Sequence, residues 1–182
     1  MLIPNLLLIA GTGTKSGKTS LACRIIEQFP DLMITAIKIS PHFHETTPGL
    51  ISKSEKIGYS IYEETNRKTE KDTSRMLRSG AKRVFFAKVW DDQLLTVFNE
   101  IMEYIPVNLP IICESPALRN FIEPGVFIIM TSNVVNKEMN INHLQELPHL
   151  MITLEELNSI DSLPIGFEGN KWFYKTEKTE YF

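Results

Sequence analysis

The chain has few residues of the kinds that mark special classes of protein. Only two of its 182 residues are cysteines, Cys23 and Cys113, which is too few for a disulfide scaffold and fits a reducing compartment. Its formal net charge is only -3, so no charge excess indicates nucleic acid or an anionic membrane as the partner. No apolar run approaches the roughly 20 residues of a membrane span. We therefore expect a cytoplasmic protein that acts on a small molecule.

The overall composition is that of an ordinary globular protein, with 43% hydrophobic and 23% charged residues. This length suits one domain with a sizeable core. We interpret residues 1–175 as a single domain and residues 176–182 as a frayed tail. The apolar start lacks the basic leading region of a signal peptide.

A glycine-rich segment, Gly11-Thr12-Gly13-Thr14-Lys15-Ser16-Gly17-Lys18-Thr19, follows the apolar run Leu6–Ala10. A strand, a glycine-rich loop and a helix in this order are typical of a phosphate-binding loop, because glycines let backbone N–H groups crowd around an anion. Lys18 would reach the β- and γ-phosphates of a nucleoside triphosphate, and Thr19 would place its hydroxyl on Mg²⁺. The residues that we expect to bind the nucleotide are Gly13, Thr14, Lys15, Ser16, Gly17, Lys18, Thr19 and Ser20.

The spacing of this segment differs from the commonest form. The usual first glycine, five residues before Gly17, is here Thr12, and Gly11 stands one residue earlier. Apolar residues then recur at helical spacing, as a helix packed on a sheet requires: Leu21, Ala22, Ile25, Ile26 and Phe29. An ordinary glycine-rich turn that happens to contain Gly-Lys-Thr is the alternative interpretation.

Strand-like runs alternate with helical patterns along the rest of the chain. We expect strands at 33–39, 83–89, 109–113, 125–130 and 149–153, helices at 72–79 and from Asp91 or Asp92 to 105, and an edge hairpin at 164–175. Residues 40–71 read as a long active-site loop with a short hairpin or helix around 57–62. The alternation predicts an α/β protein with a mostly parallel β-sheet flanked by helices on both faces. Together with the phosphate-binding motif at 11–19, it indicates the P-loop NTPase fold.

Polar residues at the ends of the expected strands form a candidate site, because ligands bind outside the carboxyl ends of parallel strands. Glu114 follows the apolar run 109–113 and either binds Mg²⁺ or is a solvated strand-end residue. Asp72 opens a helix and is either its N-cap or a second metal ligand. Lys38 either neutralises a phosphate or an acidic substrate, or is solvated. Thr131 ends another strand at the same edge.

Two histidines and one arginine are further candidates. His42 and His44 are spaced like metal ligands but lack a third partner for zinc, so acid–base catalysis or substrate contact is the better functional interpretation. Arg119 either contacts a phosphate or lies on the surface.

Base recognition is weakly encoded. Asn136-Lys137-Glu138-Met139 stands where many GTP-binding proteins carry Asn-Lys-x-Asp, and Met139 replaces the carboxylate that would pair with guanine. Side chains such as Asn133 or Asn136 would then have to read the base, and the nucleotide is GTP or ATP.

Two families resemble this chain over roughly residues 3–135. The loop at 11–19 resembles that of the dethiobiotin synthetases, in which the first glycine is displaced in the same way. The middle of the chain resembles the molybdopterin-guanine dinucleotide biosynthesis adaptor protein family (MobB). The matching segments are Ala36-Ile37-Lys38-Ile39-Ser40-Pro41-His42, Lys71-Asp72-Thr73-Ser74-Arg75 and Ser79-Gly80-Ala81.

This resemblance implies that Asp72 and Glu114 join Thr19 as ligands of Mg²⁺, and it also implies a homodimer. The chain departs from the families at Ser115, where glycine is usual, in its degraded histidine motif, and in the longer loop between Lys38 and Asp72. These departures leave a different substrate open.

We assign Lys18, Lys38 and Asp72 to catalysis and expect Mg²⁺-dependent binding of a nucleoside triphosphate, with slow hydrolysis and a role in molybdenum cofactor maturation. One alternative is an ATP-dependent synthetase or kinase that acts on a small acidic metabolite held by Lys38 and the loop at 40–71. Another is a non-catalytic, nucleotide-gated adaptor that docks a protein partner.

Overall fold

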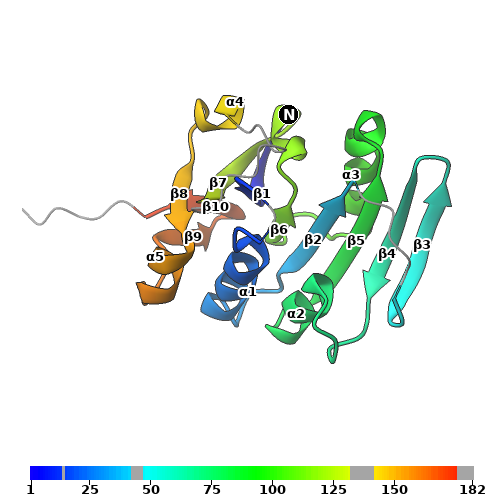
Figure 1. Ribbon diagram of the computed structural model, residues 1–182, viewed down its shortest axis with the longest axis horizontal. Coiled ribbons are helices and arrows are strands. Elements are labelled where there is room, and N and C mark those ends of the chain that lie inside the picture. The colour runs from blue at the N-terminus through cyan, green and yellow to red at the C-terminus, as the bar shows by residue number, and fades with distance from the viewer. Residues whose placement is uncertain (14, 42–46, 132–141, 176–182) are drawn as a thin grey trace, which may run out of the picture.

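A large mixed β-sheet forms the centre of the computed structural model, which describes residues 1–13, 15–41, 47–131 and 142–175. In this part of the chain the sheet has eight strands in the order β3-β4-β5-β2-β6-β1-β7-β8 (Figure 1). The strands are β1 (Leu2–Gly11), β2 (Thr35–Ser40), β3 (Leu50–Lys56), β4 (Tyr59–Glu64), β5 (Arg83–Val89), β6 (Ile111–Glu114), β7 (Glu123–Thr131) and β8 (Leu150–Thr153). The neighbours from β5 to β8 are parallel, and β4 is antiparallel to both β3 and β5.

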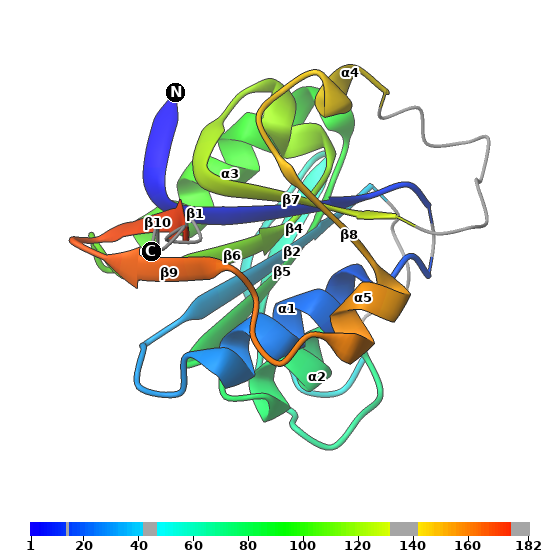
Figure 2. The same cartoon turned by 90° about the vertical axis from the view of Figure 1, so that its left-hand side faces the viewer.

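Helices cover both faces of this sheet (Figure 2). One face carries α1 (Lys18–Gln28), α2 (Asp72–Arg78) and α5 (Leu154–Ser159). The other carries α3 (Leu94–Glu103), α4 (Asn142–Gln145) and the 3-10 helix η2 (Ala117–Asn120). The expected α/β architecture, with a mostly parallel sheet between two layers of helices, is therefore confirmed.

The central strand β1 shows why the sheet lies between two layers. Its segment from Leu6 to Ala10 is fully buried, and successive side chains point to opposite faces. Leu6 and Leu8 belong to the core under α3, whereas Leu7 and Ile9 belong to the core under α1 and α2. A strand that is buried on both sides reads as a continuous apolar run, and this run made β1 recognisable in the sequence.

The interpretation of residues 40–71 as one long loop is wrong for its central part. Strands β3 and β4 form a hairpin around Ile57 and Gly58, and β4 pairs with β5. The suggested hairpin around 57–62 is thus real but longer. Pairing shifts between Ser52 and Ser54, which breaks the alternation of side chains that identifies a strand in a sequence.

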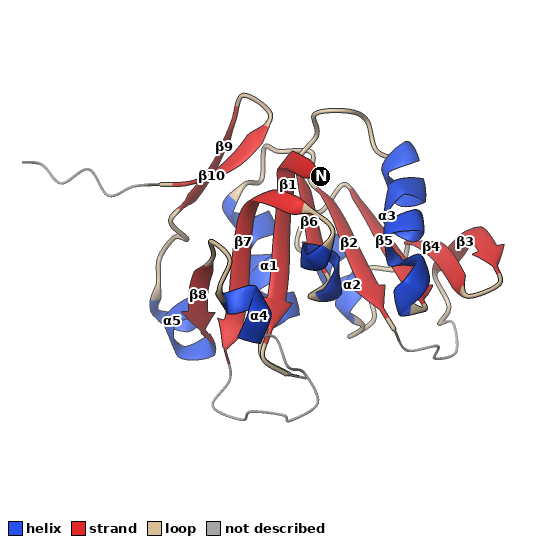
Figure 3. Cartoon of the chain, turned by 90° about the horizontal axis from the view of Figure 1, so that it is seen from above, coloured by secondary structure: helices blue, strands red, loops and turns tan. Residues whose placement is uncertain are grey.

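Three other expectations are corrected in detail. The strand expected at 33–39 begins at Thr35. The helix expected from Asp91 or Asp92 begins with the 3-10 helix η1 (Asp91–Gln93), which has no side-chain cap, and continues as α3. The hairpin of β9 (Ile165–Glu168) and β10 (Lys171–Tyr174) forms a separate small sheet, and its strand β10 packs near β1 and β7 rather than extending the sheet edge (Figure 3).

In the described part of the chain, no helix has the length and apolar character needed to cross a membrane. Cys23 and Cys113 are both free and buried, as the low cysteine content suggested.

Candidate functional site

The candidate site lies at the edge of the sheet where β1, β2 and β6 end. These three strands are parallel neighbours, so their carboxyl ends share one edge. The register places Lys38 of β2 beside Glu114 of β6, and Glu114 in turn beside Ile9 of β1. Two charged side chains thus meet directly next to the strand that enters the glycine-rich loop.

In the glycine-rich loop, residues 11–19, Ser16 and Lys18 lie close to Gly11 at the end of β1. A Cβ at Gly11 would lie 2.3 Å from Ser16 Oγ and 2.9 Å from Lys18 Cγ, far inside normal contact distance. A side chain at this position would have to displace Ser16 and Lys18, which is a physical reason for glycine at the displaced position. Gly17 precedes α1 with a φ of 93°, a conformation that favours glycine.

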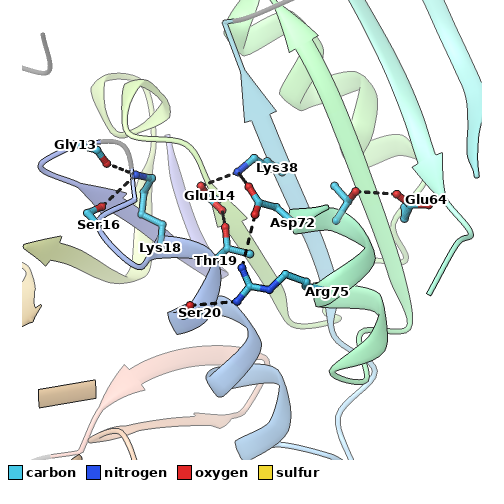
Figure 4. Close-up of polar contacts among 11 residues, drawn as sticks. Gly13, Ser16, Lys18, Thr19, Ser20, Lys38, Glu64, Asp72, Arg75 and Glu114 are labelled. Atoms are coloured by element: carbon cyan, nitrogen blue, oxygen red, sulfur yellow. Dashed lines mark hydrogen bonds and ion pairs between the residues drawn. The ribbon is translucent and has the colours of Figure 1, made fainter. Parts of the chain in front are cut away.

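Lys18 lies at the start of α1 and its ammonium turns back onto the loop. It donates to the Gly13 carbonyl at 2.7 Å and to Ser16 Oγ at 3.1 Å (Figure 4). Burial lowers the pKa of Lys18 below its usual value, and the nearby Glu114 carboxylate partly opposes this shift. The ammonium is thus held between Gly13 and Ser16 and is partly buried, which disfavours its charged form.

Four elements, α1, β2, α2 and β6, bring a hydroxyl, an ammonium and two carboxylates together beside this loop. Thr19 donates from Oγ1 to Glu114 Oε2 at 2.9 Å. Lys38 Nζ lies 2.5 Å from Asp72 Oδ2 and 2.9 Å from Glu114 Oε1 (Figure 4). Burial acts to lower the pKa of Lys38, but Glu114 and Asp72 outweigh it, so the pKa is raised and Lys38 stays charged. Glu114 itself is only 5% exposed.

Asp72 is not the N-cap of α2. It is the first residue of that helix, the N-cap is Lys71, and no side-chain cap hydrogen bond forms. The Asp72 carboxylate instead points toward Lys38 and also lies 3.8 Å from an Arg75 nitrogen. The capping explanation is therefore wrong, and the orientation fits a residue of the site.

Arg75 links the two helices that border the site. Its guanidinium donates to Ser20 Oγ of α1 at 3.2 Å while it faces Asp72 of its own helix. No role for Arg75 was predicted from the sequence. Its spacing of three residues from Asp72 places both on one face of α2 and was the available signal.

Behind the site, Glu64 fixes the start of α2. This buried carboxylate accepts from Thr73 Oγ1 at 2.8 Å and from the Asn66 backbone N–H at 2.8 Å. Since Thr73 follows Asp72 directly, Glu64 fixes the first turn of α2, from which the Asp72 side chain extends to Lys38.

These groups surround one hollow of about 500 Å³. Its walls come from the glycine-rich loop and α1, from the ends of β2 and β6, from the first turn of α2, and from Leu154 of α5: Lys15, Ser16, Gly17, Lys18, Thr19, Ser20, Lys38, Ile39, Ser40, Pro41, Asp72, Arg75, Glu114, Pro116 and Leu154. Four of the lining side chains are cationic and two are anionic, so the hollow suits a ligand with several negative charges.

The donor set fits Mg²⁺, which prefers a few oxygen ligands and keeps several waters. Thr19, Asp72 and Glu114 supply a hydroxyl and two carboxylates, and the cation that now bridges the carboxylates is Lys38. Among the described residues, no group of three or more His, Cys, Asp or Glu side chains is arranged to hold a metal ion, so a metal here would need oxygens from a ligand as well.

Several expected residues do not meet at this site. Arg119 donates to the Ile122 carbonyl at 3.0 Å, lies over the Phe127 ring, and does not line the hollow. Thr131 ends β7 at the same edge but is also outside the lining. Five candidates fall outside the described residues: Thr14, His42, His44, Asn133 and the segment 136–139.

Comparisons with protein-family models, with curated proteins and with solved structures find no significant match to this chain.

Proposed function

We propose that this chain binds a magnesium nucleoside triphosphate, GTP or ATP, on a P-loop NTPase fold and hydrolyses it slowly. One observation carries the proposal. The glycine-rich loop with its inward Lys18 and the cluster of Thr19, Lys38, Asp72 and Glu114 line the same hollow. An ordinary glycine turn would not be expected to gather an excess of cations beside two carboxylates and a hydroxyl.

Each group has a defined task in this proposal. Lys18 would leave the Gly13 carbonyl to contact the β- and γ-phosphates, while loop amides and the positive end of α1 bind the same oxygens. Thr19, Asp72 and Glu114 would hold Mg²⁺, which neutralises phosphate charge when bound. Lys38 would add positive charge near the γ-phosphate.

Hydrolysis of the triphosphate would be slow because both carboxylates of the hollow would serve as metal ligands. Within the described residues, Asp72 and Glu114 are the only carboxylates that line the hollow, and both are paired with Lys38. As metal ligands they would not be available to orient an attacking water, which fast hydrolysis requires.

A second candidate is transfer to a small acidic acceptor, as in a synthetase or kinase. It is favoured by Arg75 and Ser40, which also line the hollow and have no task in binding the triphosphate or the metal. A role in molybdenum cofactor maturation rests on the resemblance to MobB, and so do the non-catalytic adaptor and the homodimer.

Nucleotide binding is tested by thermal unfolding with ATP, GTP and CTP, with Mg²⁺ or with EDTA. We expect at least one triphosphate to raise the melting temperature of the wild type and to have no such effect on Lys18→Ala. Lys68→Ala, which removes an exposed lysine outside the hollow, is the matched control and should respond like the wild type. An equal rise in the Lys18 variant would refute the assignment of the loop.

Turnover distinguishes the candidates once a nucleotide is known. Phosphate release by the protein alone should be slow. A screen of small carboxylic acids should leave it unchanged for a simple hydrolase, and a strong stimulation by one acid would favour the synthetase or kinase instead.

A further inference from the structure

Every carboxylate oxygen of the candidate metal site already faces a donor of the protein. Lys38 Nζ contacts one oxygen of Asp72 and one of Glu114, at 2.5 and 2.9 Å. The second oxygen of Glu114 accepts from Thr19 at 2.9 Å, and the second oxygen of Asp72 lies 3.8 Å from Arg75. Lys38 therefore stands between the two carboxylates, where a bridging cation would be placed (Figure 4).

Lys38 and a metal ion cannot share this position. Mg²⁺ binds oxygen at about 2.0–2.1 Å, so an ion held by Asp72 or Glu114 would come into close contact with the ammonium and repel it. The lysine stem is flexible, and the Lys38 side chain is 19% exposed toward the hollow that it lines. Metal binding thus requires Lys38 to swing away from the carboxylates.

A displaced Lys38 ammonium would lose both of its anionic partners while it is still mostly buried, which is unfavourable. Free Mg²⁺ brings no replacement partner, whereas a triphosphate brings oxygens that can accept from the ammonium. The cost of moving Lys38 is therefore offset only when metal and triphosphate arrive together.

We propose that Lys38 is a specificity residue. Its ammonium prevents free divalent cations from binding to Asp72 and Glu114, and it leaves these carboxylates only when a metal arrives together with a triphosphate. Only the binding of a metal together with a triphosphate rests on the proposed function. The exclusion of the free ion can be tested with this protein and a metal, without any nucleotide. The opposing view is that Lys38 forms a permanent structural ion pair that no metal replaces.

The test is the binding of Mn²⁺ without nucleotide, followed by electron paramagnetic resonance. We compare the wild type with Lys38→Met, which keeps the apolar stem and removes the ammonium. Lys71→Met is the matched control, since it removes the same charge next to Asp72, and the exposed Lys71 side chain lies outside the hollow and is not among those that contact the two carboxylates.

We expect Lys38→Met to bind Mn²⁺ at least about tenfold more tightly than the wild type, and Lys71→Met to stay within about threefold of it. Equal affinity in Lys38→Met and the wild type would overturn the proposal, as would tight binding of free Mn²⁺ by the wild type. If Lys38→Met folds poorly, Lys38→Gln replaces it and must meet the same criterion.

Two further measurements separate this proposal from the proposed function. Without nucleotide, Mg²⁺ should raise the melting temperature of Lys38→Met clearly more than that of the wild type, because the variant lacks its internal counterion. With a triphosphate present, wild-type Mn²⁺ affinity should rise at least about tenfold. If the wild type binds no triphosphate, the proposed function fails, while the nucleotide-free comparison still decides whether Lys38 excludes the metal.

Discussion

Replacing Glu114 with glutamine tests the carboxylate cluster in two independent ways. Glu114 is 5% exposed and accepts two hydrogen bonds, from Thr19 and from the charged Lys38. Glutamine keeps the size and one acceptor oxygen but loses the charge and points an NH₂ group at one of these donors. A hydrogen bond to a charged group contributes about 1 kcal/mol more than a neutral one, so the two altered contacts together cost about 2 kcal/mol.

This loss is large enough to measure by thermal unfolding. For a domain of this size, 1 kcal/mol shifts the melting temperature by about 2–4 °C, so Glu114→Gln should melt about 4–8 °C below the wild type in EDTA. Asp72→Asn should lose less, because the Asp72 side chain is 39% exposed and ion pairs at such positions are worth about 1 kcal/mol or less.

The second effect concerns the metal. Removing a full negative charge from a hard oxygen site should raise the Mg²⁺ midpoint of nucleotide-dependent stabilisation at least about tenfold, or about 1.4 kcal/mol, in both variants. Nucleotide affinity in EDTA should change much less, because Lys18 and the loop remain in place. The measurement is a Mg²⁺ titration at saturating triphosphate.

Glu100→Gln is the matched control. Glu100 accepts from Tyr59 at 2.6 Å and from Lys56 at 2.9 Å, so it too loses charge-assisted bonds, but it does not line the hollow. Its variant should lose stability and keep the wild-type Mg²⁺ midpoint. If Glu114→Gln behaves in the same way, Glu114 is only a structural partner of Lys38 and the metal assignment is refuted.

Three further predictions concern the loop, the pH dependence and the base. Gly11→Ala should lower the free energy of unfolding, measured in urea, by about 1–3 kcal/mol and should weaken triphosphate binding, because its Cβ would displace Ser16 and Lys18. Unchanged triphosphate binding would contradict the assignment of the loop. Hydrogen bonds from Arg83 and then Lys53 lower the pKa of Glu63 to about 2, so the Glu63 carboxylate stabilises the fold above its ordinary pKa near 4.5 and loses this effect as the pH falls toward 2. The difference in free energy of unfolding between the wild type and Glu63→Gln should therefore become smaller from pH 4.5 to pH 2. A constant difference would contradict this role of Glu63. Since Met139 replaces the guanine-binding carboxylate, competition binding should show less than about tenfold preference between GTP and ATP, and about a hundredfold preference for GTP would reveal a guanine reader elsewhere.

The parts of the fold that could be predicted are those with local signals. The run Leu6–Ala10 is buried on both faces and reads as a strand, and Gly11 to Thr19 marks the turn into α1. Because parallel strands end at one edge, Lys38 and Glu114 could be expected near this loop, and the register places them side by side.

The parts that could not be predicted depend on tertiary contacts. The hairpin of β3 and β4 is hidden by the register shift near Lys53 and is held by pairing with β5, which is distant in the sequence. Asp72 fits the pattern of a helix cap, and only the approach of β2 shows that its carboxylate pairs with Lys38 instead. Arg75 and Leu154 enter the site because helices from different parts of the chain meet there.

Isothermal titration calorimetry of the wild type and Lys18→Ala with the preferred triphosphate and Mg²⁺ tests the central claim most directly. We predict one triphosphate per wild-type chain and an affinity at least about a hundredfold lower in the variant, or about 2.7 kcal/mol, because Lys18 lies inside the loop at 2.7 Å from the Gly13 carbonyl, ready to contact phosphate. Lys68→Ala should match the wild type. Equal affinities in wild type and Lys18→Ala, or no binding of ATP, GTP or CTP by the wild type, would contradict the account.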